Sequence, residues 1–180
     1  KKNQKPNETE KNGAKLTNFL NSEGIGLIHI VSDTISINLK PEAIYEFLHG
    51  MRLKSYSFDR YKSKKESNIL KVNITSSKKF NKKIYDKLKA IELGVNYTKD
   101  LVSEPGNILH PDEYAKRLIQ LKKIGLKVSV YNEKQLKKMG CNALVGVGQG
   151  SIRGTYLVTL EWRGKKSNSK PLAFVGKGVC

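Results

Sequence analysis

Apolar residues recur along the first half of the chain with two spacings, one typical of helices and one typical of strands. Helical spacing predicts a short helix near residues 16–20 and another from Pro41 to about Met51. An apolar run at residues 26–31 predicts a buried strand, and alternation at residues 70–74 predicts a second strand. The residues expected on the apolar faces of the two helices are Leu16, Phe19, Leu20, Ile44, Phe47, Leu48 and Met51.

A longer apolar stripe begins at Phe80, stops before Pro105 and predicts one long helix. Its members are Phe80, Ile84, Leu88, Ile91, Val95 and Val102. Because the stripe covers about six helical turns, the helix is long enough to bridge two domains.

Beyond Pro105, short helical and strand patterns alternate. Helices are expected at residues 111–124, ending at Gly125, and from Asn132, which matches a capping box with Gln135 and precedes a C-cap at Gly140. Strands are expected around Val128 and Val130, at residues 156–162 and at residues 172–175. This alternation predicts an α/β fold with a mainly parallel or mixed sheet covered by helices.

The 180 residues allow one ordinary domain, or the end of one domain and the start of another. The chain starts at Lys1 and stops within a glycine-flanked motif, so we expect an internal fragment of a longer protein. Cys141 and Cys180 show neither a disulfide framework nor metal-ligand spacing, which fits a reducing cytosol. The longest apolar run, residues 25–31, is far too short to span a membrane, which predicts a soluble protein.

The formal net charge of +18 comes almost entirely from lysine. Proteins that recognise nucleic-acid bases favour arginine, and these lysines are dispersed in pairs without interleaved aromatic residues. Solvated surfaces are therefore the favoured explanation, and a basic nucleic-acid-binding module is the alternative. A nucleotide-binding function ranks last, because no glycine-rich phosphate loop precedes residue 80.

Three further segments carry information beyond the fold. Residues 103–111 hold two prolines and a glycine, which predicts a shaped connection or a plain interdomain turn. Residues 144–151 space their glycines by two, which favours a tight turn or close backbone packing over a phosphate cradle, because a strand is expected to follow. Aromatic rings and an Asp-Arg pair in residues 56–62 favour a structural role. The histidines are scattered, at positions His29, His49 and His110.

Lys177 is the strongest candidate for chemistry. It follows the apolar residues 172–175 and is flanked by Gly176 and Gly178. A lysine at the end of an apolar strand is difficult to explain by packing, and the glycines allow the backbone to approach another group closely. Ligands of α/β proteins usually bind at strand ends, so this segment is expected to form part of an active site.

Four segments, taken in their order along the chain, resemble the leucyl aminopeptidase family, the cytosolic di-metal aminopeptidases. They are residues 56–62, residues 100–107 with Pro111 and Ala115, residues 144–151, and residues 175–179. The resemblance covers about residues 45–180. Its motif positions besides Lys177 are Asp100, Pro105, Asn107, Gly146, Gly148, Gly150, Gly176 and Gly178.

The resemblance implies a two-domain subunit. Residues 1–79 would be the C-terminal half of an N-terminal α/β domain, residues 80–104 a linker helix, and residues 105–180 the start of an α/β/α catalytic domain. Lys177 would ligate one of two divalent ions, Mn²⁺ or Zn²⁺, through its amine. The other ligands and the catalytic lysine and arginine would lie beyond Cys180, which leaves no catalytic residue within this chain.

The resemblance further implies a metal-dependent exopeptidase that releases leucine-like N-terminal residues from peptides, with a metal-activated water. Its partners would be peptide substrates and further copies of itself in a homohexamer, located in the cytoplasm and without a membrane. The chain by itself is expected to be inactive.

Overall fold

A computed structural model describes residues 7–34, 42–64, 70–164 and 170–178. The chain divides into two compact units, residues 1–103 and residues 104–180. Pro41, Val179 and Cys180, which entered the sequence predictions, lie outside the described residues. None of the helices in the described ranges combines the length and the hydrophobicity needed to cross a bilayer.

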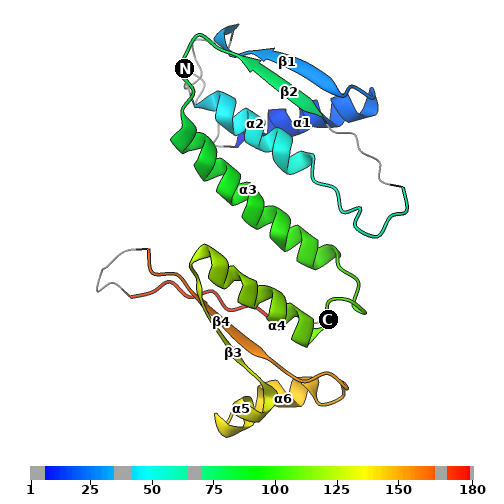
Figure 1. Ribbon diagram of the computed structural model, residues 1–180, viewed down its shortest axis with the longest axis vertical. Helices are drawn as coiled ribbons and strands as arrows, with labels where there is room; N and C mark the ends of the chain where they lie inside the picture. The colour runs from blue at the N-terminus through cyan, green and yellow to red at the C-terminus, as the bar shows by residue number, and fades with distance from the viewer. Residues whose placement is uncertain (1–6, 35–41, 65–69, 165–169, 179–180) are drawn as a thin grey trace. The chain divides into compact units, whose positions relative to one another are not determined.

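The described residues of the first unit form two strands and three α-helices (Figure 1). In chain order these are α1 (Glu8–Ser22), β1 (Leu27–Val31), the 3₁₀ helix η1 (Ser32–Thr34), α2 (Ala43–Lys54), β2 (Lys71–Thr75) and α3 (Lys82–Ser103). The two strands pair in parallel, with Leu27 opposite Lys71 and Val31 opposite Thr75. The two strands and the three helices predicted for this part of the chain are therefore confirmed, although α1 is longer than expected.

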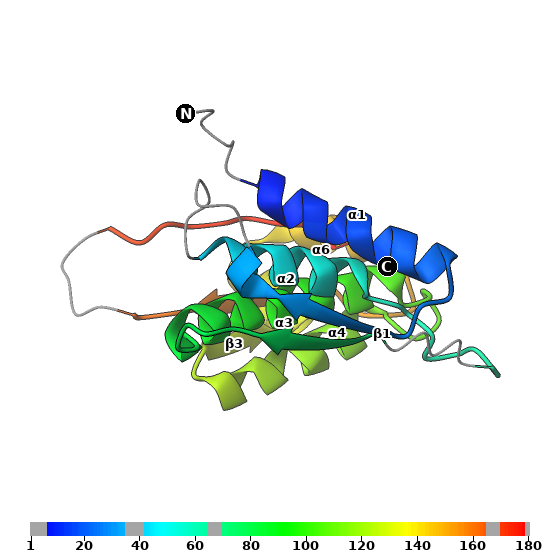
Figure 2. The ribbon, with the colours of Figure 1, turned by 90° about the horizontal axis from the view of Figure 1, so that it is seen from above.

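The core of the first unit lies where α1 crosses α2, seen side by side in Figure 2. Gly13 and Gly50 face the backbone of the opposite helix, which brings the two helices very close. Thr17 is fully buried in this crossing, and its hydroxyl donates to the carbonyl of Gly13 at 3.1 Å. Phe19, predicted to lie in the core, is 57% exposed, because the buried face of α1 is formed by Gly13, Thr17 and Leu20 instead.

Two further predictions about burial in this unit are wrong, one of them only in part. The strand β1 is half exposed, with Leu27 51% exposed, because within the described residues it belongs to a two-stranded sheet. Of the predicted stripe of α3, Ile84, Leu88 and Val95 are half-buried, but Val102 is 81% exposed and the fully buried position of the helix is Glu92. Glu92 can turn inward because it pairs with Arg52 of α2.

The second unit places a helix along an antiparallel strand pair (Figure 1). Its elements are α4 (Pro111–Ile119), the 3₁₀ helix η2 (Gln120–Ile124), β3 (Lys127–Tyr131), α5 (Glu133–Lys138), α6 (Asn142–Gly148) and β4 (Leu157–Glu161). Lys127 lies opposite Glu161. With one parallel and one antiparallel pair among its helices, the described chain fits the predicted α/β class.

Local signals in this unit predict the ends of elements well. Gly125 ends the first helical segment with a φ of 95°, a conformation that favours glycine. The capping box of Asn132 and Gln135 is present, and Gly140 follows α5 with a φ of 74°. Both predicted helices are confirmed, with the last turns of the first wound as 3₁₀ helix, and so are the predicted strands that correspond to β3 and β4.

Two segments of the second unit differ from expectation. The glycine-containing residues 144–148 belong to α6 and are not a turn, because nothing in the helix prevents glycine from adopting helical angles. Residues 172–175 are extended but are not a strand, since they pair with no strand in the described part of the chain. Phe174 is 89% exposed.

Candidate functional site

Lys177 lies in an exposed, extended segment, residues 170–178, drawn in red in Figure 1. A methyl group added at Gly176 would meet no atom within 4 Å. One added at Gly178 would lie 3.0 Å from Cε1 and 3.5 Å from Cδ1 of Tyr114, a half-buried residue of α4. Of the two glycines that flank Lys177, only Gly178 is therefore needed for a close backbone approach.

The first turn of α4 is held by a charged cluster that the sequence did not predict. His110 is the N-cap, and its Nδ1 lies 2.5 Å from Oδ1 of Asp112. The same nitrogen lies 3.4 Å from the backbone N–H of Glu113, the contact through which His110 caps the helix. Arg153, from the segment between α6 and β4, reaches Oδ2 of Asp112 at 3.4 Å.

The cluster also changes the acidity of Asp112. Burial acts to raise its pKa, but its own backbone N–H, His110 and Arg153 together hold the pKa below the ordinary aspartate value. The ionised form of Asp112 is thus favoured by folding, and the negative charge suits the N-terminus of α4.

We expect Asp112→Asn to weaken the pH dependence of stability in acid. Because the pKa of Asp112 is lower in the folded than in the unfolded state, its ionised form stabilises the fold at any pH above the unfolded-state pKa. This stabilisation is lost as the pH falls through the folded-state pKa. The urea concentration at the unfolding midpoint should therefore fall more for the wild type than for the variant between about pH 6 and about pH 3. This range brackets the pKa of about 3.9 that an aspartate has in the unfolded state. Fluorescence of Trp162, next to β4, reports on this unit. Equal losses would contradict a role for Asp112.

A buried ion pair anchors the connection between α3 and α4. The side chain of Glu104 is 0% exposed, and its Oε1 accepts from Nη1 of Arg117 at 2.7 Å. Arg117 also donates to Glu113, at 3.1 Å, one turn earlier on α4. A buried carboxylate is tolerated only when paired in this way. The pair fixes the connection to the helix, which confirms the predicted shaped turn.

The other motif positions of this connection have structural roles or are exposed. The carbonyl of Pro105 accepts from the amides of Ile108 and Leu109, both at 2.9 Å, and closes the turn. Asn107 is exposed. Asp100, in the last turns of α3, accepts from the Tyr56 hydroxyl at 2.8 Å and pairs with Arg60 at 3.8 Å.

The aromatic segment 56–62 packs as predicted. The rings of Phe58 and Tyr61 meet edge to face with centroids 5.9 Å apart, and the Lys99 ammonium lies 4.9 Å above the Tyr56 ring. Partial burial and the bond to Asp100 raise the pKa of Tyr56, so the phenol stays protonated and keeps donating. The segment therefore joins the end of α2 to α3.

The glycines of α6 do not form a phosphate cradle. Gly148 packs against Thr155, whose Oγ1 would lie 2.0 Å from an added methyl group. Gly146 and Gly150 have no such neighbour within 4 Å. Close packing, one of the two favoured explanations, is thus correct at Gly148 alone.

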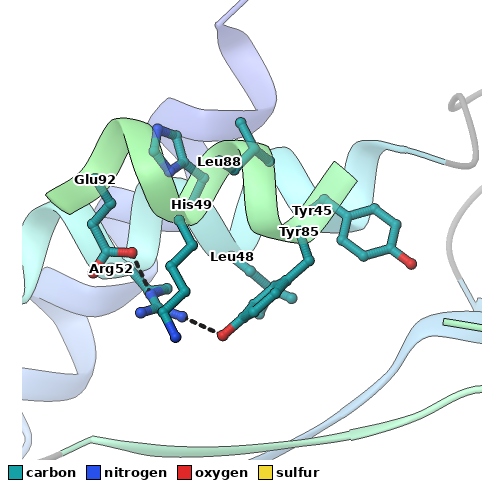
Figure 3. Close-up of a pocket in the computed structure, with 8 residues that line it drawn as sticks. Tyr45, Leu48, His49, Arg52, Tyr85, Leu88 and Glu92 are labelled. Carbon is teal, nitrogen blue, oxygen red and sulfur yellow. Dashed lines mark hydrogen bonds and ion pairs between the residues drawn. The ribbon is translucent and has the colours of Figure 1, made fainter. Parts of the chain in front are cut away.

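A small pocket of the first unit lies between α2 and α3 (Figure 3). Nε of Arg52 is 2.5 Å from Oε2 of Glu92, and its Nη1 donates to the Tyr85 hydroxyl at 2.6 Å. Burial acts to lower the pKa of Arg52, but Glu92 and Tyr85 outweigh it and raise that pKa. The ion pair with Glu92 and the hydrogen bond to Tyr85 link Arg52 of α2 to α3, so this pocket is a structural contact between the two helices.

The described residues contain no group of three or more histidine, cysteine, aspartate or glutamate side chains that could hold a metal ion. The three histidines lie in β1, α2 and the N-cap of α4. The accessible amine of Lys177 suits one coordination position, but within the described ranges it does not form a complete metal site with other donors.

Residues 96–180 match the family described as the cytosol aminopeptidase family, catalytic domain. The probable cytosol aminopeptidase of Phytoplasma australiense is 44% identical over 153 residues, which cover 83% of this chain and 31% of that protein. The corresponding protein of Brucella ovis is 39% identical over 174 residues, which cover 93% of this chain and 34% of that protein. The chain thus spans about a third of the length of these curated relatives.

Solved structures agree on the fold. The bottromycin maturation enzyme BotP aligns with a TM-score of 0.69 and 21% identity, covering 84% of this chain and 33% of that one. A structure of BotP in complex with Mn aligns with a TM-score of 0.68 and 20% identity, with the same coverage.

Proposed function

Because the chain belongs to the cytosol aminopeptidase family, we propose that it is part of a longer metal-dependent aminopeptidase that releases N-terminal residues from peptides. The observation that carries this proposal is the match of residues 96–180, which include Lys177, to the catalytic domain of that family. The names of the curated relatives support an aminopeptidase, and a leucine-like preference is our extension of that activity.

In this proposal Lys177 supplies one amine ligand to a pair of divalent ions, Mn²⁺ or Zn²⁺. An amine binds a metal only when it is deprotonated, so metal affinity should rise with pH. Bound metal would supply a polarised scissile carbonyl and an activated water. The remaining ligands would come from parts of the protein outside this chain, since the described residues offer no acidic cluster.

The connection and α4 would hold this segment in place. The ion pair of Glu104 and Arg117 fixes the start of the second unit to α4. His110 and Asp112 hold the first turn of the same helix. In the proposed protein the subunits form a homohexamer in the cytoplasm, with peptides as substrates. Nucleic acid is a disfavoured partner, because the excess positive charge is carried by dispersed lysines and not by arginine, the residue that base recognition favours.

We expect the longer protein that contains this chain to release leucine from a leucine amide in the presence of Mn²⁺ or Zn²⁺. A chelator should abolish the activity, and added metal should restore it. The 180-residue chain alone should be inactive, because one amine cannot hold the metal pair. Chelator-sensitive hydrolysis by the chain alone would contradict the assignment of the other ligands. Inactivity of the metal-loaded longer protein would contradict the aminopeptidase proposal.

A further inference from the structure

Tyr114 lies against the backbone of the residue that follows Lys177. An added methyl group at Gly178 would lie 3.0 Å from Cε1 of Tyr114, closer than side-chain carbons normally approach. No such neighbour lies within 4 Å of Gly176, on the other side of the lysine. The segment is therefore fixed on one side of Lys177, and the contact is made by the edge of an aromatic ring.

The helix that carries Tyr114 is well anchored. The neighbouring residue Ala115 is 4% exposed, and α4 packs along β3. Arg117, one turn later, holds both Glu104 and Glu113. The ring of Tyr114 thus projects from a rigid support, whereas residues 170–178 are not part of a strand.

We propose that Tyr114 is a positioning residue for Lys177. By supporting the backbone at Gly178, the ring limits the directions in which the adjacent amine can point. A ligand held in one direction loses less conformational entropy when it binds a metal ion, so the ring should strengthen metal binding without touching the metal. This inference rests on the proposed metal site and adds to it a residue outside the coordination sphere.

The test is a Mn²⁺ titration of the longer protein and its variants, with bound metal measured after dialysis. Tyr114→Ala should weaken metal affinity by about 10-fold, the low end for groups that orient metal ligands. Tyr114→Phe keeps the ring and should bind like the wild type. Gly178→Ala should also weaken binding, whereas the matched variant Gly176→Ala should not.

A double variant that carries both Gly178→Ala and Tyr114→Ala tests the contact itself. If Gly178→Ala acts by collision with the ring, it should cause little further loss in the Tyr114→Ala background. The melting temperature should change little in every variant, which separates positioning from general destabilisation. The proposal would be overturned if the two substitutions weakened Mn²⁺ binding independently of each other, or if Tyr114→Ala bound Mn²⁺ as tightly as the wild type.

Failure of the proposed function has a different signature. If Lys177→Met weakens metal binding and Tyr114→Ala does not, only the positioning role is wrong. If the wild type binds no Mn²⁺ and Lys177→Met changes nothing, the metal site and the positioning role are both wrong. In that case the contact itself can still be measured through the Hα chemical shift of Gly178 in the 180-residue chain. A neighbouring aromatic ring displaces this chemical shift, and Tyr114→Ala should remove the displacement.

Discussion

Lys177→Met in the metal-loaded longer protein is expected to empty one metal position and reduce turnover more than about 100-fold, the upper end for groups that merely orient metal ligands. Methionine keeps an unbranched apolar stem but lacks the amine. Because the polarised carbonyl and the activated water both depend on the metal pair, the loss should appear mainly in kcat. Lys177→Arg should do no better, since a guanidinium stays protonated and cannot ligate.

Lys170→Met provides the matched control for this prediction. Lys170 is an exposed lysine of the same extended segment, so its replacement should leave metal content and turnover unchanged. If Lys177 is only a surface lysine, its methionine variant will also keep two metals per subunit and normal turnover. Metal analysis of the two variants therefore decides whether the amine is a ligand.

The second large effect is expected at the crossing of α1 and α2. A methyl group added at Gly13 would lie 2.0 Å from the carbonyl oxygen of Phe47, and one at Gly50 would lie 1.9 Å from that of Glu10. These obstacles are backbone atoms, so no side-chain rotation relieves the overlap and the helices must separate. We expect Gly50→Ala to lower the free energy of unfolding of the first unit by about 3 kcal/mol, the upper part of the range for overpacked cores.

Gly94→Ala is the control for helix propensity. Gly94 lies in α3 with nothing within 4 Å of the added methyl group, so alanine there should stabilise by about 0.5–1 kcal/mol. Amide hydrogen exchange in α2 measures the first unit, and exchange in β3 provides an internal reference in the second unit. Equal exchange in α2 of Gly50→Ala and the wild type would show that the crossing is looser than described.

Local sequence signals were sufficient for most of the fold. The capping box at Asn132 and the glycine at 125 mark ends of elements, because the required conformation depends on neighbouring residues alone. The burial of β1 and of α3 could not be predicted, since it depends on which distant element covers each face. Residues 172–175 show the same limit, because an apolar run becomes a strand only beside another strand.

The candidate site was only partly accessible to sequence reasoning. The glycines around Lys177 marked the segment as unusual, and Gly178 lies against the ring of Tyr114. Glu113 and Arg117 have the spacing of a helical ion pair and could have been found. Glu104 and Arg153 could not, because their partners are set by the folded chain and lie 13 and 41 residues away.

The parallel pairing of β1 and β2 also affects how the protein is made. The strand that begins at residue 27 can pair only after residue 71 has been synthesised, which is 44 residues later (71 − 27). At about 5–20 residues per second, a ribosome takes roughly 2 to 9 s to supply that partner. During this interval α1 and β1 are exposed to other nascent chains, with an unpaired strand edge that favours aggregation. A chaperone that binds apolar segments would therefore be needed most while residues 32–70 are emerging from the ribosome.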